Sequence, residues 1–139
     1  MDRVAIIDAV KRLGLPADDF VVVSSAALAM RGIREAKDID IVVTPCLWKE
    51  LSTQHSVDIY HGVERIRCYD RIEILNPHDS VYGDKGPVPL ADLITEADVI
   101  DGIRFNNLDH LKAIKRVLAR EKDLRDIAII DTYRTSAGK

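Results

Sequence analysis

The sequence predicts an α+β (α/β) domain, a small mixed β-sheet flanked by helices, over residues 1–139. Two kinds of apolar pattern alternate along the chain. Short runs rich in β-branched residues are typical of buried strands, and longer stretches with apolar residues three or four apart are typical of helices. Because the helical patterns also stand at both ends of the chain, we expect a mostly buried sheet with helices packed around it.

Composition narrows the class of protein. With 139 residues, 47% hydrophobic and 31% charged, the chain has the balance of one soluble globular domain. No apolar run approaches the roughly 18 residues of a spanning helix, and residues 1–15 lack the layout of a signal peptide. Two cysteines, Cys46 and Cys68, make no disulfide framework, so we expect a cytoplasmic protein without membrane contact. The net charge of −3 argues against broad coating of nucleic acid but not against a local basic site.

The first elements are a helix and a strand. Residues 1–13 show helical spacing, with Asp2 as a plausible N-cap and Gly14 as the stop. The run Asp19–Val23 is short, apolar and β-branched, which predicts a buried strand.

A pair of serines opens the next helix. We expect Ser24 or Ser25 to be its N-cap and Gly32 to end it after about Arg31. Free backbone N–H groups at such a helix start attract anions, and small side chains let phosphate oxygens approach closely. Taken alone, ordinary N-capping explains the pair without any ligand.

The second strand, Asp38–Val43, carries two carboxylates in an apolar run. Successive strand side chains alternate faces, so Asp38 and Asp40 point the same way, with Cα atoms roughly 6.5 Å apart. Two like charges so placed repel each other unless a cation lies between them, and Mg²⁺ takes one or two carboxylates with phosphates and water. The alternative is an exposed face on which the aspartates pair with Arg34 or Lys37. For the Asp-x-Asp pattern alone, that simpler interpretation is favoured.

The middle of the chain predicts a helix and then two or three short strands. Thr44-Pro45 starts a helix that runs to about Gln54, since proline suits the first helical position. Residues 57–77 alternate apolar and polar side chains and break at His61-Gly62 and near Asp70.

A third acid stands in one of these strands. Ile72 and Ile74 take one strand face, which leaves Glu73 on the other. If this strand pairs beside Asp38–Val43, three carboxylates converge on one patch. Asp70 is the competing candidate, although it stands at a predicted turn.

The C-terminal half begins with a glycine- and proline-rich segment, residues 78–89, which is either a plain surface loop or a lid over a site. The elements expected after it are a helix over 90–96, an extended segment over 102–105, a helix over 108–119 capped by Asn107, a helix over 124–133 and a flexible tail over 135–139.

Cations gather on one of these helices. Lys112, Arg116 and Arg120 recur every four residues and so share a helix face, with Lys115 and Lys122 nearby. Lysine and arginine are the usual phosphate ligands. The alternative is a solvated helix face whose cations pair with neighbouring aspartates. The aspartates available for this pairing are Asp109, Asp123 and Asp126.

Taken together, residues 19–130 resemble the DNA polymerase β-like nucleotidyltransferases, and most closely the small prokaryotic members, which include the toxin-type enzymes of abortive-infection systems. That family has a Gly-Gly or Gly-Ser pair opening a short helix, then Asp-x-Asp, then a third acid on a later strand. Here Ser24-Ser25 occupies the pair, Asp38 and Asp40 match the aspartates, and Glu73 falls at the third acid. The segment "LDHLKAIKRVLAREKDLRDIAII" is similar to the family's lysine-bearing helix and R-x-K-D-x-x-D segment.

The resemblance implies a minimal nucleotidyltransferase fold and the transfer of a nucleoside monophosphate from an NTP to an acceptor hydroxyl. It makes Asp38, Asp40 and Glu73 the catalytic residues and the ligands of Mg²⁺, with Mn²⁺ as the other candidate metal. Glu73 is also a candidate acceptor of the hydroxyl's proton. The implied nucleotide-binding residues are Ser24, Ser25, Arg34, Lys37, Lys115 and Lys122.

The acceptor stays open: an RNA such as tRNA, a protein or a small molecule. Two departures from the family pattern matter, because Ser24 brings a Cβ where the family has glycine and Glu73 replaces the commoner aspartate. The Ser24-Ser25 replacement motivates a second hypothesis, a catalytically degenerate binding or regulatory module, for example of a toxin–antitoxin pair, with a cognate antitoxin or a second copy as partner. An acidic structural domain without a ligand is the third.

Overall fold

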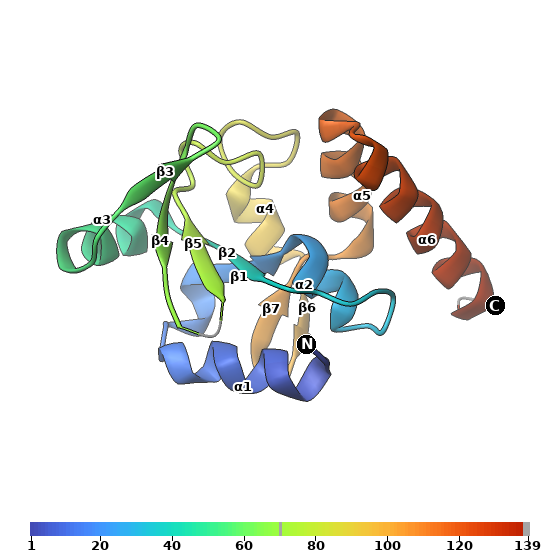
Figure 1. The fold of residues 1–139 in the computed structure, drawn as a ribbon, viewed down its shortest axis with the longest axis horizontal. Coiled ribbons are helices and arrows are strands. Elements are labelled where there is room, and N and C mark those ends of the chain that lie inside the picture. The colour runs from blue at the N-terminus through green and yellow to red at the C-terminus, as the bar shows by residue number, and fades with distance from the viewer. Residues whose placement is uncertain (70, 138–139) are drawn as a thin grey trace.

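The computed structural model describes residues 1–69 and 71–137. In these residues it has an α+β architecture, with a seven-stranded mixed open sheet and six α-helices (Figure 1). The helices are α1 (Arg3–Leu13), α2 (Ser24–Ala29), α3 (Pro45–Gln54), α4 (Leu90–Thr95), α5 (Leu108–Leu118) and α6 (Glu121–Ala137). The strands are β1 (Phe20–Val23), β2 (Ile39–Val43), β3 (Asp58–Tyr60), β4 (Val63–Arg67), β5 (Ile72–Leu75), β6 (Asp98–Ile100) and β7 (Ile103–Phe105).

The strand order is β3-β4-β5-β2-β1-β7-β6. At its centre β2 pairs antiparallel with β1 and parallel with β5, and β1 pairs parallel with β7. The β3–β4 and β6–β7 hairpins form the two edges of the sheet. This register places Asp40 directly opposite Glu73 on the neighbouring strand.

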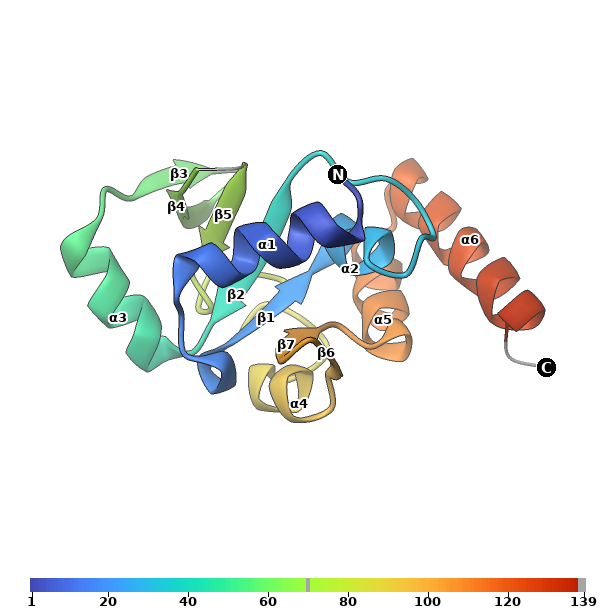
Figure 2. The ribbon, with the colours of Figure 1, turned by 90° about the horizontal axis from the view of Figure 1, so that it is seen from below.

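Alternation along the central strands separates a core face from a site face. Ile39, Ile41, Ile72 and Ile74 are buried on one face, whereas Asp40 and Glu73 on the other are only half-buried. Helix α1 lies along one side of the sheet (Figure 2), and its residues Ile6 and Val10 belong to the hydrophobic core.

The end signals read from the sequence are confirmed at three helices. Asp2 caps α1 and Gly14 ends it in the left-handed conformation, Thr44 caps α3, and Asn107 caps α5 by accepting a hydrogen bond from the backbone of His110. Of the two or three strands predicted over residues 57–77, three are present, and β3 and β4 are joined at the predicted His61-Gly62 break. None of the described helices is long and apolar enough to cross a membrane.

The prediction that a serine caps α2 is wrong. Helix α2 already begins at Ser24, its N-cap position is Val23, and no side chain makes the capping hydrogen bond. The helix ends at Ala29 rather than near Arg31. Ser24 instead has a positive φ of 60°, which lets the chain turn sharply from β1 into the helix.

Two C-terminal predictions also need correction. Strand β6 was missed, although Asp101-Gly102, with positive φ at both residues, is a strong hairpin signal. Helix α6 runs from Glu121 through Ala137, so most of the expected flexible tail is helical, and residues 138–139 lie outside the described part. An ion pair between Arg134 and Asp109 ties this last stretch to α5.

Candidate active site

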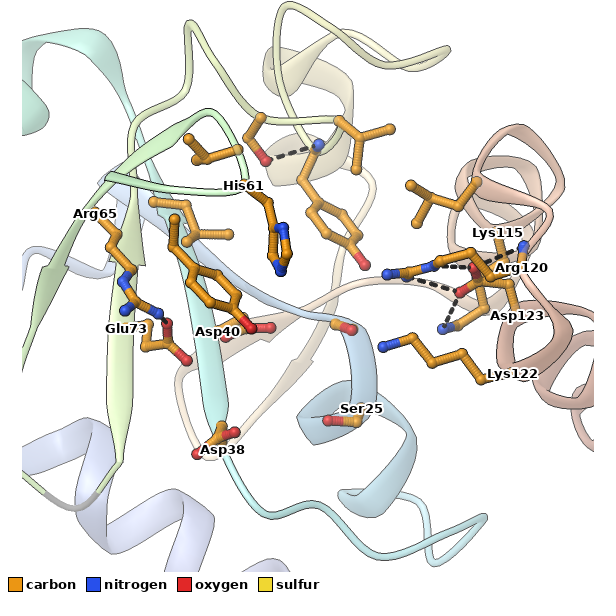
Figure 3. A pocket seen from close by; sticks show the side chains of 18 of the residues that line it. Ser25, Asp38, Asp40, His61, Arg65, Glu73, Lys115, Arg120, Lys122 and Asp123 are labelled. Atoms are coloured by element: carbon orange, nitrogen blue, oxygen red, sulfur yellow. Dashed lines mark hydrogen bonds and ion pairs between the residues drawn. The ribbon is translucent and has the colours of Figure 1, made fainter. Parts of the chain in front are cut away.

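A cavity of about 550 Å³ lies between the site face of the sheet and the α5–α6 pair (Figure 3). We call its sheet side, formed by Asp38, Asp40, Glu73 and Arg65, the acid wall. The opposite side, the helical wall, is formed by Lys115, Arg120, Lys122, Asp123 and Asp126. The turn between β3 and β4, the 78–89 loop and the start of α2 also line it, as do Arg34, Leu75 and Leu118.

The acid wall contains all three predicted carboxylates. Asp40 and Glu73 are direct neighbours on parallel strands, so the strand pairing on which the expected convergence depended is present. Asp38 is exposed just before β2 and lines the same cavity. The competing candidate Asp70 lies outside the described residues.

Negative charge on the acid wall is only partly balanced. Burial, and then the charges of Glu73 and Asp38, raise the pKa of Asp40 to about 7, while Arg65 and Lys122 act in the opposite direction. Within residues 1–69 and 71–137 no cation forms an ion pair with Asp40. A cation entering this wall would therefore favour ionised Asp40 and lower its pKa.

Arg65 is a member of the acid wall that the sequence analysis missed. Its guanidinium is ion-paired to Glu73 and donates a hydrogen bond from Nε to Asp58 at 2.8 Å. It also lies over the Tyr60 ring, 4.3 Å from the ring centroid. The register of β4 against β5 pairs Arg65 with Leu75 and Arg67 with Glu73, so Arg65 reaches Glu73 diagonally, a contact between strands that the sequence of one strand does not reveal.

The helical wall is a network of paired charges. Lys115 is only 3% exposed, and its Nζ lies 2.9 Å from Asp126 and 3.6 Å from Asp123. Arg34 donates two hydrogen bonds to Asp126, at 2.7 and 2.9 Å. Arg120 pairs with Asp123 through Nε at 2.6 Å, and this pairing raises the pKa of Arg120.

These contacts revise the predicted roles of the cations. The spacing put Arg120 on the same helix face as Lys112, but α5 ends at Leu118. Lys112 is ion-paired to Asp131 of α6. Since Lys115 is buried in ion pairs, the exposed Lys122 is the cation of this wall best placed to reach a ligand. Lys37 lies outside this cavity and lines an adjoining hollow that shares Asp38 and Lys122 with it.

Ser24 and Ser25 both line the cavity where β1 ends. The left-handed φ of Ser24 is one that glycine adopts freely and serine rarely, so the strain expected from the missing glycine is present. Its hydroxyl interacts with the side chain of Tyr82, a residue of the 78–89 loop that is 6% exposed. Burial raises the pKa of Tyr82, so it stays a neutral hydroxyl in the cavity.

The 78–89 loop has no helix or strand, as predicted, but it is tightly packed. A Cβ at Gly83 would lie 2.1 Å from the carbonyl oxygen of Pro77, and one at Gly86 would lie 1.7 Å from that of Val81. Both positions therefore require glycine. This packing holds Tyr82 against the cavity.

The donor chemistry of the acid wall fits Mg²⁺. Across residues 1–69 and 71–137, no three His, Cys, Asp or Glu side chains are already gathered closely enough to hold a metal. Mg²⁺ does not need such a cluster, because it commonly binds through one or two carboxylates and completes its shell with water and substrate phosphates. Asp40 together with its neighbour Glu73 matches that number of ligands.

Comparison with protein-family models, with curated proteins and with solved structures gave no match. What the cavity can do follows from its two walls. Unbalanced carboxylates on one side and an exposed lysine on the other suit a ligand that brings a divalent cation and a polyanion together, as a metal-bound triphosphate does.

Proposed function

We propose that the protein is a Mg²⁺-dependent nucleotidyltransferase of the polymerase β-like type, acting in the cytoplasm. It would transfer a nucleoside monophosphate from an NTP to an acceptor hydroxyl, which belongs to an RNA such as tRNA, a protein or a small molecule. The observation that carries the proposal is the pairing of Asp40 with Glu73 on parallel strands, beside Asp38, with charge that the protein leaves partly unbalanced.

The roles of the chain's own residues follow from where they lie. Asp38, Asp40 and Glu73 would hold Mg²⁺, or Mn²⁺ in its place. When bound, the metal would neutralise triphosphate charge and polarise the reacting oxygens. Lys122, on the opposite wall, would bind phosphate oxygens, while Ser24 and Ser25 would place backbone N–H groups near them.

Arg65 and Lys115 would act indirectly. Arg65 pairs with one oxygen of the Glu73 carboxylate, Oε1, and so would fix the position of that carboxylate. Lys115 is buried between Asp123 and Asp126, and we assign it the role of fixing the start of α6, and thus Lys122, at the cavity. Glu73 would be the candidate acceptor for the proton that leaves the acceptor hydroxyl.

A second candidate function is a binding or regulatory module without catalysis, for example in a toxin–antitoxin pair with a cognate antitoxin or a second copy of the chain. The strained serine at the start of α2 and the Arg65–Glu73 ion pair favour it. The Ser24 side chain reduces the space that phosphate groups would need, and the Arg65 ion pair occupies a carboxylate that a metal would need.

Calorimetric titration of the four NTPs, with and without Mg²⁺, tests the proposal before any acceptor is known. The proteins would be wild type, Asp38→Asn/Asp40→Asn, and the control Asp8→Asn/Asp92→Asn, which removes the same charge from exposed positions outside the cavity. We expect Mg²⁺-dependent binding in wild type and control, lost in the site variant. No NTP binding by folded wild type would refute the proposal and favour the regulatory module. Equal binding by all three proteins would refute the role of the aspartates.

A further inference from the structure

Two aromatic side chains at the tip of the β3–β4 hairpin line the cavity beside the acid wall. The rings of Tyr60 and His61 are 4.1 Å apart between centroids, with their planes at 67°. Tyr60 is 54% exposed, so part of its ring surface is open to a ligand. Figure 3 shows the His61 imidazole pointing from the turn into the cavity, between the acid wall and the helical wall.

The Tyr60 ring is held in place from behind. The Arg65 guanidinium lies over it, and the same group is ion-paired to Asp58 and to Glu73. Two carboxylates therefore fix the cation on which the ring rests. An exposed aromatic surface that is already oriented binds a flat ligand with less loss of side-chain freedom than a mobile one.

The backbone at His61 gives a second, independent observation. His61 and Gly62 both have positive φ, 51° and 79°, the conformation of a type I′ hairpin turn. Asparagine, aspartate and glycine are preferred at the first of these positions, and the other hairpin of the sheet has Asp101 there. Histidine is one of the few other residues that tolerate this φ, and here the turn directs its imidazole into the cavity.

We infer that Tyr60 and His61 form the platform on which the base of the bound nucleotide stacks. This inference rests on the proposed NTP substrate and adds the site of its base. A platform next to the acid wall would put the base at one end of the cavity and the triphosphate near Lys122. The cavity of about 550 Å³ is within the range of small-molecule sites, roughly 300–1,000 Å³.

Stacking predicts the kind of selectivity to expect. Every base has a π-face, so a stacking surface contributes affinity without choosing strongly among bases. Loss of one stacking ring should therefore weaken all four NTPs by similar factors, roughly 5- to 150-fold. Inorganic tripolyphosphate, which has no base, should be unaffected.

The test measures binding of the four NTPs and of inorganic tripolyphosphate, each with Mg²⁺, to wild type and three hairpin variants. His61→Asn removes the imidazole but suits the turn, Tyr60→Leu removes the aromatic ring, and Tyr60→Phe keeps the ring and loses only the hydroxyl. The matched control is Tyr69→Ala, since Tyr69 is also an exposed tyrosine under an arginine, Arg12, but lies outside the cavity.

We expect His61→Asn and Tyr60→Leu to weaken every NTP while tripolyphosphate binds as to wild type. Tyr60→Phe should weaken NTP binding less than Tyr60→Leu does, because its ring remains, and Tyr69→Ala should behave as wild type. Unchanged NTP affinity in both ring-removing variants overturns the platform and leaves the nucleotidyltransferase proposal standing. Equal weakening of NTP and tripolyphosphate also overturns it, because the hairpin would then only support the fold. If wild type binds every NTP no more tightly than tripolyphosphate, the base adds no affinity, and the platform is refuted. If it binds neither, the proposed function fails with it.

Discussion

The two walls of the cavity use the same residue types in opposite ways. On the helical wall, Asp123 and Asp126 are almost fully buried and each has cations within ion-pair distance. On the acid wall, Asp40 has no ion-pair partner among the described residues, and burial with two neighbouring carboxylates raises its pKa. Carboxylates with ion-pair partners stabilise the fold, whereas a carboxylate without one can still gain free energy by binding a cationic ligand. Charged residues in a sequence motif can therefore serve the fold or the site, and only their partners distinguish the two roles.

Breaking the matched wall should have the largest effect on stability. Asp126→Asn removes the carboxylate that pairs with Lys115 and Arg34, and leaves the buried lysine with only the longer contact to Asp123. Removing one partner of a buried ion pair costs roughly 3–5 kcal/mol of unfolding free energy. Urea unfolding followed by circular dichroism measures it.

Asp131→Asn is the matched control for that variant. It also removes an α6 aspartate that pairs with an α5 lysine, Lys112, but the Asp131 side chain is 54% exposed. Exposed pairs contribute about 0–1 kcal/mol. Similar losses in the two variants would contradict the view that the buried network supports the fold.

Neutralising the unmatched wall should instead stabilise the protein. The pKa of Asp40 is raised in the folded state to about 7, so between roughly pH 4 and pH 7 the folded state holds a proton that the unfolded state has lost. Unfolding free energy from this group therefore falls as pH rises through that window. In EDTA at pH 7, Asp40→Asn should be roughly 4 kcal/mol more stable than wild type, and most of the gain should vanish near pH 4.

Paired urea titrations of both proteins across that pH range measure this difference. A constant difference between wild type and Asp40→Asn would contradict the assigned pKa. Asp8→Asn, on the exposed surface of α1, controls for charge removal as such and should stay within about 0.5 kcal/mol of wild type.

Replacing Arg65, the cation of the acid wall, tests how strongly its charge affects Asp40. Arg65 lowers the pKa of Asp40 through its charge, so Arg65→Gln should raise that pKa above its wild-type value. The partly buried ion pair with Glu73 is also lost, at a cost of about 1–2 kcal/mol. Carboxyl-carbon NMR titration reads the pKa directly. A lower pKa of Asp40 in this variant would show that Arg65 does not act on it as assigned.

The smallest expected change in stability is at the start of α2. Ser24→Gly removes the strain of a left-handed serine, which stabilises the fold by about 1–2 kcal/mol. It also increases the conformational entropy of the unfolded chain, which destabilises the fold by about 0.4–1 kcal/mol. The net gain should be within about 1 kcal/mol. Ser25→Gly, inside the same helix, has no strain to relieve and should lose about 0.5–1 kcal/mol. Thermal unfolding of both variants compares them, and equal losses would show that Ser24 is not strained.

The sequence predicted most elements and the acid side of the site for a simple reason. Alternation along a strand is a local property, so Asp40 and Glu73 could be placed on the face opposite the core isoleucines from sequence alone. Helix caps such as Thr44 and Asn107 are local in the same way. That the three carboxylates hold a metal remains a prediction.

What the sequence could not predict depends on contacts between distant segments. The ion pair of Arg65 with Glu73 needs the pairing of β4 with β5, and the burial of Lys115 needs the α5–α6 pair. Serine is a preferred N-cap residue, so the sequence suggested a cap at Ser24 or Ser25. The sharp turn out of β1 instead makes Ser24 the first residue of the helix. The missed strand β6 is different, since its Asp101-Gly102 turn was visible in the sequence.

The walls of the cavity also differ in when they come into existence. All carboxylates of the acid wall stand at or before residue 73, whereas the helical wall belongs to α5 and α6, after residue 108. Synthesis starts at the N-terminus, so the residues of the acid wall are made before those of the helical wall. Any ligand that needs both must wait until the last two helices have docked. The complete cavity lining therefore exists only after nearly the whole chain has been synthesised and folded.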